Sequence, residues 1–177
     1  CLLTAAAAPT AGTDGLGGGG GGGQDGAGAD GGSGTVIVRY PFHATVPALG
    51  GDVVYDILDE GVAYRVHEFR TVGTSTLEVL RETEVEYLVV GGGASGTRGQ
   101  CAVYWGHGGG GGGVSTGSVR FAAGDVDVVV GAGGAGAVSQ SCAVEHTGNS
   151  GGSSSIVHSV TISALGGSGA GSRQPNG

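Results

Sequence analysis

Apolar residues along this chain gather in short runs of the length of a β-strand. Many of these runs are rich in valine and aromatic residues, whose branched or flat side chains suit a pleated surface. Turn signals at Gly50-Gly51, Asp59-Glu60-Gly61 and Gly73 separate several of them. The runs are TVIVRY (35–40), DVVYDIL (52–58), AYRVHEF (63–69), STLEVL (75–80), VEYLVV (85–90), CAVYW (101–105), SVRFAAG (118–124), VDVVV (126–130) and SIVHSVTISAL (155–165). Almost nothing has a sustained helical period, so the pattern predicts a mostly β protein with essentially no α-helix.

Tracts of glycine alternate with these strands. Glycine accounts for 44 of the 177 residues, whereas average usage is about 7%. Such tracts are ordinarily flexible linkers. The alternative is a set of packed polyglycine-II helices, which have three residues per turn and no internal hydrogen bonds, so that their backbone groups must pair with neighbouring segments. The regular recurrence of a strand followed by a glycine tract favours packing, and we predict short β-strands combined with packed polyglycine-II helices.

Composition and charge exclude several classes of function. The net charge is −8 and the seven basic residues are all scattered arginines, which disfavours nucleic acid as a partner because binding it requires a basic face. No apolar run approaches the roughly 20 residues that span a bilayer. The chain contains no methionine, so we expect it to be a processed product or a piece of a longer polypeptide.

The glycine tracts also contain motif-like spacings that could suggest an enzyme. Gly91, Gly93 and Gly96 follow a strand with the G-x-G-x-x-G spacing of a dinucleotide-binding turn. Chance matches are common at this glycine content, and no amphipathic helix follows to hold a pyrophosphate. The GNSGG stretch at 148–152 resembles a nucleophile elbow but lacks the strand–turn–helix context. We therefore predict no cofactor and no catalytic site.

Three cysteines raise the question of covalent cross-links. If the chain is extracellular, Cys101 and Cys142 are candidates for a disulfide, and Cys1 is a candidate interchain cysteine. A zinc site formed by Cys101 and Cys142 with His107 and His146 is the alternative, but the spacing of these residues does not fit the usual ligand pairs.

Two further groups of residues could form a site. Tyr104, Trp105 and His107 make the densest aromatic patch, which is either a surface for a ligand or glycan or a cap packed over the glycine helices. The acids around Asp52 to Glu60 could bind Ca²⁺, but their spacing matches no known loop, and a solvated face is the default.

The chain resembles the glycine-rich domains of bacteriophage tail fibres and related surface proteins. The similar stretches are VEYLVVGGGASG, GHGGGGGGVSTGS, VDVVVGAGGAGA, NSGGSSSIVHSVTISALGGSGAG and GGSGTVIVRY, with AYRVHEFRTVGTSTLEV resembling the usual lead-in. Together they cover about two thirds of the chain. The resemblance implies a polyglycine-II bundle combined with β-strands, and a role in fibres or receptor-binding tips. Cys101, Trp105 and His107 depart from the plain glycine, alanine and serine that the family usually has there.

The order of the motifs also departs from the family. The closing strand (35–40) comes before the opening strand (85–90), so residues 1–40 resemble the back half of one glycine-rich domain and residues 85–177 the front half of another. Residues 41–84 would be a small acidic β subdomain or connector. The assembly strands would be Val36, Ile37 and Val38 against Tyr87, Leu88 and Val89, which pair either between neighbouring subunits or by folding back within one chain.

These features lead to one functional expectation. The chain should be a non-enzymatic structural subunit of an extracellular or virion-surface fibre, and its main partner should be itself, assembled head to tail. The alternative is an adhesin module that binds a host receptor or glycan.

Overall fold

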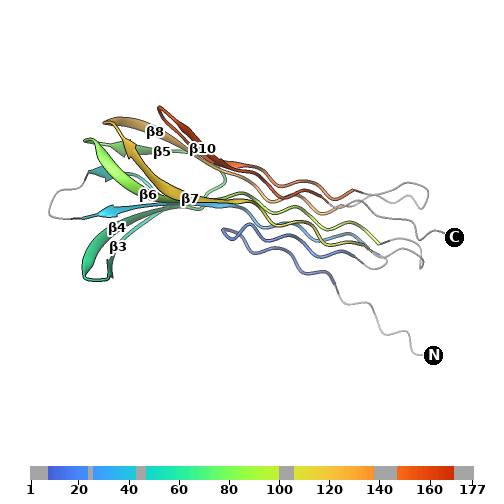
Figure 1. Ribbon diagram of the computed structural model, residues 1–177. Helices are drawn as coiled ribbons and strands as arrows, with labels where there is room; N and C mark the ends of the chain where they lie inside the picture. Colours follow the sequence, from blue (N-terminus) through green and yellow to red (C-terminus); the bar gives the residue numbers. More distant parts are fainter. Residues whose placement is uncertain (1–7, 24–25, 43–46, 100–105, 138–146, 170–177) are drawn as a thin grey trace, which may run out of the picture.

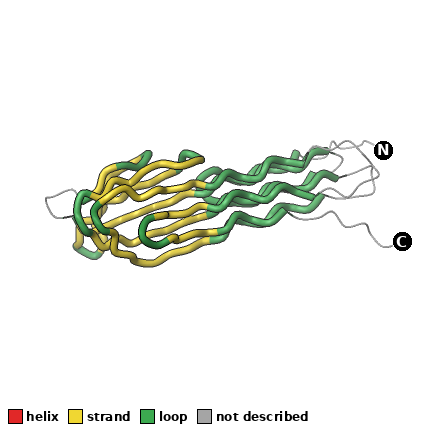
Figure 2. Tube along the Cα trace, turned by 90° about the horizontal axis from the view of Figure 1, so that it is seen from above, coloured by secondary structure: helices red, strands yellow, loops and turns green. Residues whose placement is uncertain are grey.

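The molecule is elongated and has two distinct parts (Figure 1). The computed structural model describes residues 8–23, 26–42, 47–99, 106–137 and 147–169. One part is a sandwich of β-strands. The other is a bundle of extended glycine-rich segments that run alongside one another (Figure 2). No helix occurs among the described residues, and the prediction of a mostly β fold is confirmed.

The sandwich consists of two antiparallel sheets of five strands each. The first has the order β3-β4-β1-β6-β7, and the second has the order β10-β9-β8-β5-β2. The first contains β3 (Val53–Asp59), β4 (Val62–Phe69), β1 (Thr35–Pro41), β6 (Thr83–Val90) and β7 (Val114–Phe121). The second contains β10 (Thr161–Ala164), β9 (Ser154–Val157), β8 (Gly124–Val130), β5 (Gly73–Val79) and β2 (Ala48–Leu49).

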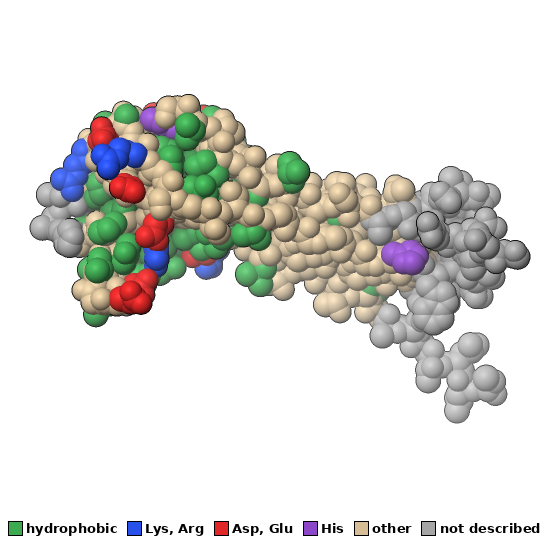
Figure 3. Space-filling model, viewed as in Figure 1, with side chains coloured by type: hydrophobic (Ala, Val, Ile, Leu, Met, Phe, Trp, Pro, Cys, Tyr) green, Lys and Arg blue, Asp and Glu red, His purple; other side chains and the backbone are tan. Residues whose placement is uncertain are grey.

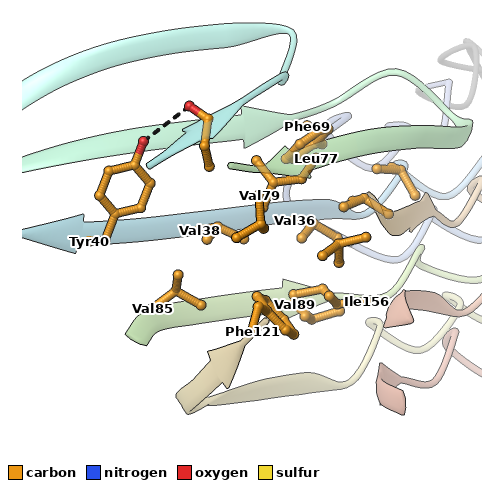
Figure 4. Close-up of a cluster of buried hydrophobic side chains, with 14 of the residues drawn as sticks. Val36, Val38, Tyr40, Phe69, Leu77, Val79, Val85, Val89, Phe121 and Ile156 are labelled. Atoms are coloured by element: carbon orange, nitrogen blue, oxygen red, sulfur yellow. Dashed lines mark hydrogen bonds between the residues drawn. The ribbon is translucent and has the colours of Figure 1, made fainter. Parts of the chain in front are cut away.

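A valine-rich core joins the two sheets (Figure 4). Alternate residues of each strand point inward, as Val36 and Val38 do on β1 and Val126 and Val128 do on β8, and all four are fully buried. Tyr40, Phe69, Phe121, Leu77 and Ile156 supply the largest buried side chains. Full burial of such a side chain contributes about 1.5–3 kcal/mol, so this half of the molecule is stabilised in the usual way.

The described residues contribute eight extended segments to the bundle. They are residues 8–14, 17–23, 26–34, 91–99, 106–113, 131–137, 147–153 and 165–169. The first two form a hairpin through a turn in which Leu16 N–H donates to Thr13 O and Gly15 adopts φ 79°. Each of the other six leads directly into a strand or continues directly from one. The sheets therefore fix the order in which the glycine segments enter the bundle.

Three sequence-based boundaries change in the structure. The run 118–124 is not one strand, because β7 covers Val114–Phe121 and Gly124 already belongs to β8. The run 155–165 is not one strand but the hairpin of β9 and β10, with His158 N–H donating to Val160 O at the bend. The strands of the acidic segment 41–84 do not form a sheet of their own. The β3–β4 hairpin extends the first sheet, and β2 and β5 belong to the second. The segment thus completes both layers of the sandwich.

Candidate functional surfaces

The two assembly strands predicted from the sequence lie side by side within a single chain. β1 pairs with β6 in antiparallel register, with Val36 opposite Val89, Ile37 opposite Leu88 and Val38 opposite Tyr87. Val36, Val38 and Val89 are fully buried in the core. In this structure of a single chain the closing strand folds back onto the opening strand, as in one of the two arrangements expected.

The segment that follows β6, residues 91–99, occupies the centre of the bundle. Its residues 91–97 are all buried. Hydrogen bonds connect it to six other segments: 17–23, 26–34, 106–113, 131–137, 147–153 and 165–169. Each of those six is also bonded to the next around the ring, for example Gly31 N–H to Gly134 O at 2.9 Å and Gly109 N–H to Gly20 O at 2.8 Å. One glycine-rich segment is thus enclosed by a closed ring of six.

Hydrogen bonds from the central segment repeat every three residues. Gly91, Ala94 and Thr97 donate to segment 106–113, Gly92 and Ser95 donate to segment 147–153, and Gly93 and Gly96 donate to segment 26–34. A repeat of three is what a polyglycine-II helix requires. The assignment of these segments as polyglycine-II helices remains a prediction, and the period of three supports it.

Close backbone packing explains why glycine is needed in this segment. A Cβ atom at Gly91, Gly92, Gly93 or Gly96 would overlap a backbone carbonyl oxygen of an adjacent segment. The three glycines with dinucleotide-like spacing, at 91, 93 and 96, therefore have a structural reason for their positions. The space beside them is filled by the protein's own backbone.

Two polar side chains of the central segment are buried with their hydrogen bonds satisfied. Ser95 and Thr97 are both 0% exposed. Ser95 Oγ accepts from Asn149 N–H at 2.8 Å, and Thr97 Oγ1 accepts from His107 N–H at 2.6 Å. Burial of a polar group is costly unless it forms a hydrogen bond. Here each hydroxyl accepts a hydrogen bond from a backbone amide that has no strand partner.

The predicted disulfide and most of the aromatic patch fall outside the described residues. These include Cys1, Cys101, Cys142, Tyr104 and Trp105. His107 is described and exposed, and it lies in segment 106–113 at the end of the bundle away from the sandwich. Figure 3 shows that charged and large apolar side chains gather on the sandwich, while the visible surface of the bundle is mostly backbone and small residues.

Three of the four acids that could have suggested a calcium site, Asp52, Asp56 and Asp59, are engaged with backbone amides or arginines. Asp52 accepts from Arg70 N–H at 2.6 Å and from Thr71 N–H at 2.7 Å, and these backbone hydrogen bonds lower the pKa of its carboxyl. Asp56 forms an ion pair with Arg65, and the hydrogen bond from Arg65 lowers the pKa of the Asp56 carboxyl as well. Asp59 binds Arg39. Among the residues with defined positions, no group of three or more potential ligands is placed to hold a metal ion.

A buried histidine that the sequence did not single out joins β4 to the turn after β2. His67 is 1% exposed; its Nδ1 lies 2.6 Å from Gly50 O and its Nε2 lies 2.8 Å from Tyr40 Oη. Because a carbonyl can only accept, Nδ1 carries a hydrogen. Burial lowers the pKa of His67, which favours the neutral imidazole. In that form Nε2 accepts from the tyrosine hydroxyl, which also lies 3.4 Å from Ala48 O.

Comparison with known proteins places the chain by its glycine-rich part. No curated protein and no solved structure matches it, and no helix in the described part of the chain is long and apolar enough to cross a membrane. The model of one protein family, described as a glycine-rich domain, matches residues 70–177, which is more than half of the chain and includes the central segment and four of the other segments of the bundle. This chain therefore belongs to the glycine-rich domain family.

Proposed function

We propose that this protein is a non-enzymatic structural module of an extracellular or virion-surface fibre. The observation that carries the proposal is the ring of six glycine-rich segments around residues 91–99. Backbone hydrogen bonds from the central segment to all six neighbours, and between those neighbours, resist bending and separation of the segments. They need no ligand to form. Such a bundle suits a rigid spacer. The resemblance of its motifs to phage tail fibres supports the location at a surface.

Assembly is proposed to proceed head to tail between copies that each keep their own β1–β6 pair. Exchange of residues 26–41 between neighbours, so that β1 of one copy completes the sheet of the next, is the second form of assembly. Ile37 and Leu88 distinguish the two because they are directly opposite each other in the register, within the range that a disulfide can bridge.

The test uses Ile37→Cys combined with Leu88→Cys in a chain whose Cys1, Cys101 and Cys142 are replaced by serine. After oxidation, the closed form should give cross-linked monomers on a non-reducing denaturing gel. A ladder of covalent multimers would show exchange instead. Each single-cysteine variant serves as the control for random cross-linking.

The fibre itself is tested by negative-stain electron microscopy of the purified protein over a range of concentrations. Elongated particles that join end to end are expected. Particles that stay separate and monodisperse at every concentration would overturn the proposal.

A receptor- or glycan-binding adhesin is the second candidate, and the path of the chain favours it. The described chain begins and ends at the same end of the bundle, away from the sandwich (Figure 1). In any longer protein the sandwich would therefore project freely from its attachment. If instead the receptor site is the aromatic patch beside His107, at the other end of the bundle, Trp105→Ala should abolish binding to a host-cell surface while particle assembly is unchanged. Equal cell binding by wild type and variant would exclude the aromatic patch as the receptor site.

A further inference from the structure

β3 is an exposed sheet edge whose usual protection is limited to the charges of Asp56 and Asp59, both of which are already in ion pairs with arginines of the same chain. It forms one edge of the first sheet, and within the described residues nothing pairs with its outer side. Five of its seven residues are apolar, and it contains no lysine, proline or glycine. Natural proteins normally blunt such edges with charge, proline, bulges or short length, because an open strand invites pairing. Of the other sheet edges, β2 and β10 are short, at two and four residues, and β7 includes Ser115, Gly117, Ser118 and the ion-paired Arg120.

The ladder defines which backbone groups of β3 face outward. Phe42 N–H donates to Ala63 O, which sets the alternation of β4: residues 63, 65, 67 and 69 bond toward β1, and the residues between them bond toward β3. The register then assigns residues 53, 55, 57 and 59 of β3 to the ladder with β4. The N–H and C=O groups of Val54, Asp56 and Leu58 consequently point to the open side.

Side chains on both faces of this edge are exposed. Val53 is 41% exposed, Tyr55 42%, Val54 47% and Leu58 76%. The hairpin is nevertheless well anchored. Its turn has Glu60 and Gly61 at φ 49° and 84°, and the Arg65–Asp56 and Arg39–Asp59 ion pairs tie it to β4 and β1. A pre-formed strand with open backbone groups and exposed apolar side chains is the arrangement used in strand addition.

Charge argues against a second copy as the occupant. In the fullest antiparallel pairing of β3 with β3 of another copy, Asp56 would lie opposite Asp56, and Asp52 would lie opposite Glu60. Like charges directly opposite are destabilising. The chain has a net charge of −8 and no lysine, so another copy offers little to offset this repulsion.

We propose that β3 binds an extended segment of a different protein, which adds to the sheet as a further antiparallel strand. The partner segment carries Lys or Arg opposite Asp56 and apolar residues on either side, which contact Val54 and Leu58 on one face and Tyr55 and Ile57 on the other. This site does not depend on fibre formation, since β3 is open in the isolated chain.

The test measures binding of two blocked, fluorescently labelled peptides, Thr-Val-Ile-Lys-Val-Ile-Thr and the same sequence with Glu in place of Lys. Binding is followed by fluorescence anisotropy with the full chain and two variants. Val54→Pro removes an outward N–H and places the proline ring on the open side, a position where edge strands tolerate proline. Val54→Thr keeps the N–H and the branched shape, and so is the matched control. Thermal melts followed by circular dichroism verify that both variants stay folded.

The Lys peptide should bind the wild type and Val54→Thr equally. Its affinity for Val54→Pro should fall by about 10-fold or more, which corresponds to the loss of one hydrogen bond or more. The Glu peptide should bind the wild type no more tightly than the Lys peptide binds Val54→Pro. Equal binding of the Lys peptide to folded Val54→Pro would overturn the proposal, and equal binding of both peptides would overturn the basic partner. Sedimentation experiments test the remaining possibility. If the wild type self-associates and Val54→Pro does not, β3 binds a second copy of this chain instead.

Discussion

The sandwich and the bundle bury similar lengths of chain by opposite means. The sandwich fills the space between its sheets with side chains such as Leu77, Phe121 and Ile156. The bundle brings backbone against backbone, and at the four glycines of its central segment, Gly91, Gly92, Gly93 and Gly96, it leaves no room for a side chain. Stability in the sandwich therefore depends on the volume and shape of apolar groups. In the bundle it depends on the absence of a Cβ atom at particular positions, and only the contacts around a glycine reveal which positions these are.

The largest effect expected from this difference is at the centre of the bundle. In Gly96→Ala the added methyl would overlap the carbonyl group of Gly21 and lie against Gly22 N. These are backbone atoms held by their own hydrogen bonds, so they cannot move aside as a core side chain does. We expect a loss of at least ~3 kcal/mol in the free energy of unfolding, the upper end of the usual overpacking range. Denaturant titration gives the total loss.

Hydrogen exchange then locates the effect of Gly96→Ala. Amides of the bundle should lose protection more than amides of β8 and β5. A bundle that exchanges as slowly as in the wild type would contradict the packing described here.

This contrast also explains how far the sequence could predict the fold. Strand propensity and turn residues located nearly every strand, and TVIVRY at 35–40 and VEYLVV at 85–90 differ from β1 and β6 by one or two residues at one end. They failed at 155–165, where the bend at His158 and Val160 contains neither glycine nor proline. Glycine tracts carry no pattern that distinguishes a central segment from an outer one, so the position of 91–99 inside a ring came only from the structure.

The candidate surfaces show the same limit. The pairing of the closing strand with the opening strand was anticipated as one of two arrangements because each was similar to a known motif. The open edge at β3 was not anticipated, since edge or interior position is a property of the sheet order. DVVYDIL at 52–58 has the same apolar character as a central strand, and nothing local to it indicates which neighbours it has.

A smaller effect is expected in the sandwich when the pH is lowered. Burial lowers the pKa of His67 in the folded state, while an unfolded histidine protonates near pH 6.5. Below pH 6.5 the unfolded state thus binds more protons, and stability falls as the pH decreases toward the lowered pKa, by up to ~1.4 kcal/mol per pH unit. The positive charge of Arg65, on the same strand, also lowers the pKa of His67, and the negative charge of Asp56 raises it.

His67→Gln isolates this contribution, because its amide can donate to Gly50 O and accept from Tyr40 without titrating. Urea unfolding of both proteins between pH 7.5 and 5 should show the wild type losing stability relative to the variant as the pH falls. Parallel curves would mean that His67 is not held neutral in the folded protein.

The smallest effect is expected at an outer position of the bundle, in the same type of glycine tract as Gly96. Gly111 is exposed, and a Cβ there would come no closer than 3.6 Å to any neighbour, Gly17 O being the nearest atom. Alanine restricts the unfolded chain without strain where the backbone is already extended, so Gly111→Ala should raise stability by about 0.4–1 kcal/mol. Denaturant titration alongside Gly96→Ala gives the comparison. If both substitutions destabilised equally, the tract would require glycine for a reason other than the contacts at each position. Opposite signs would establish that glycine is essential on the inner rows of the bundle and replaceable on the outer one.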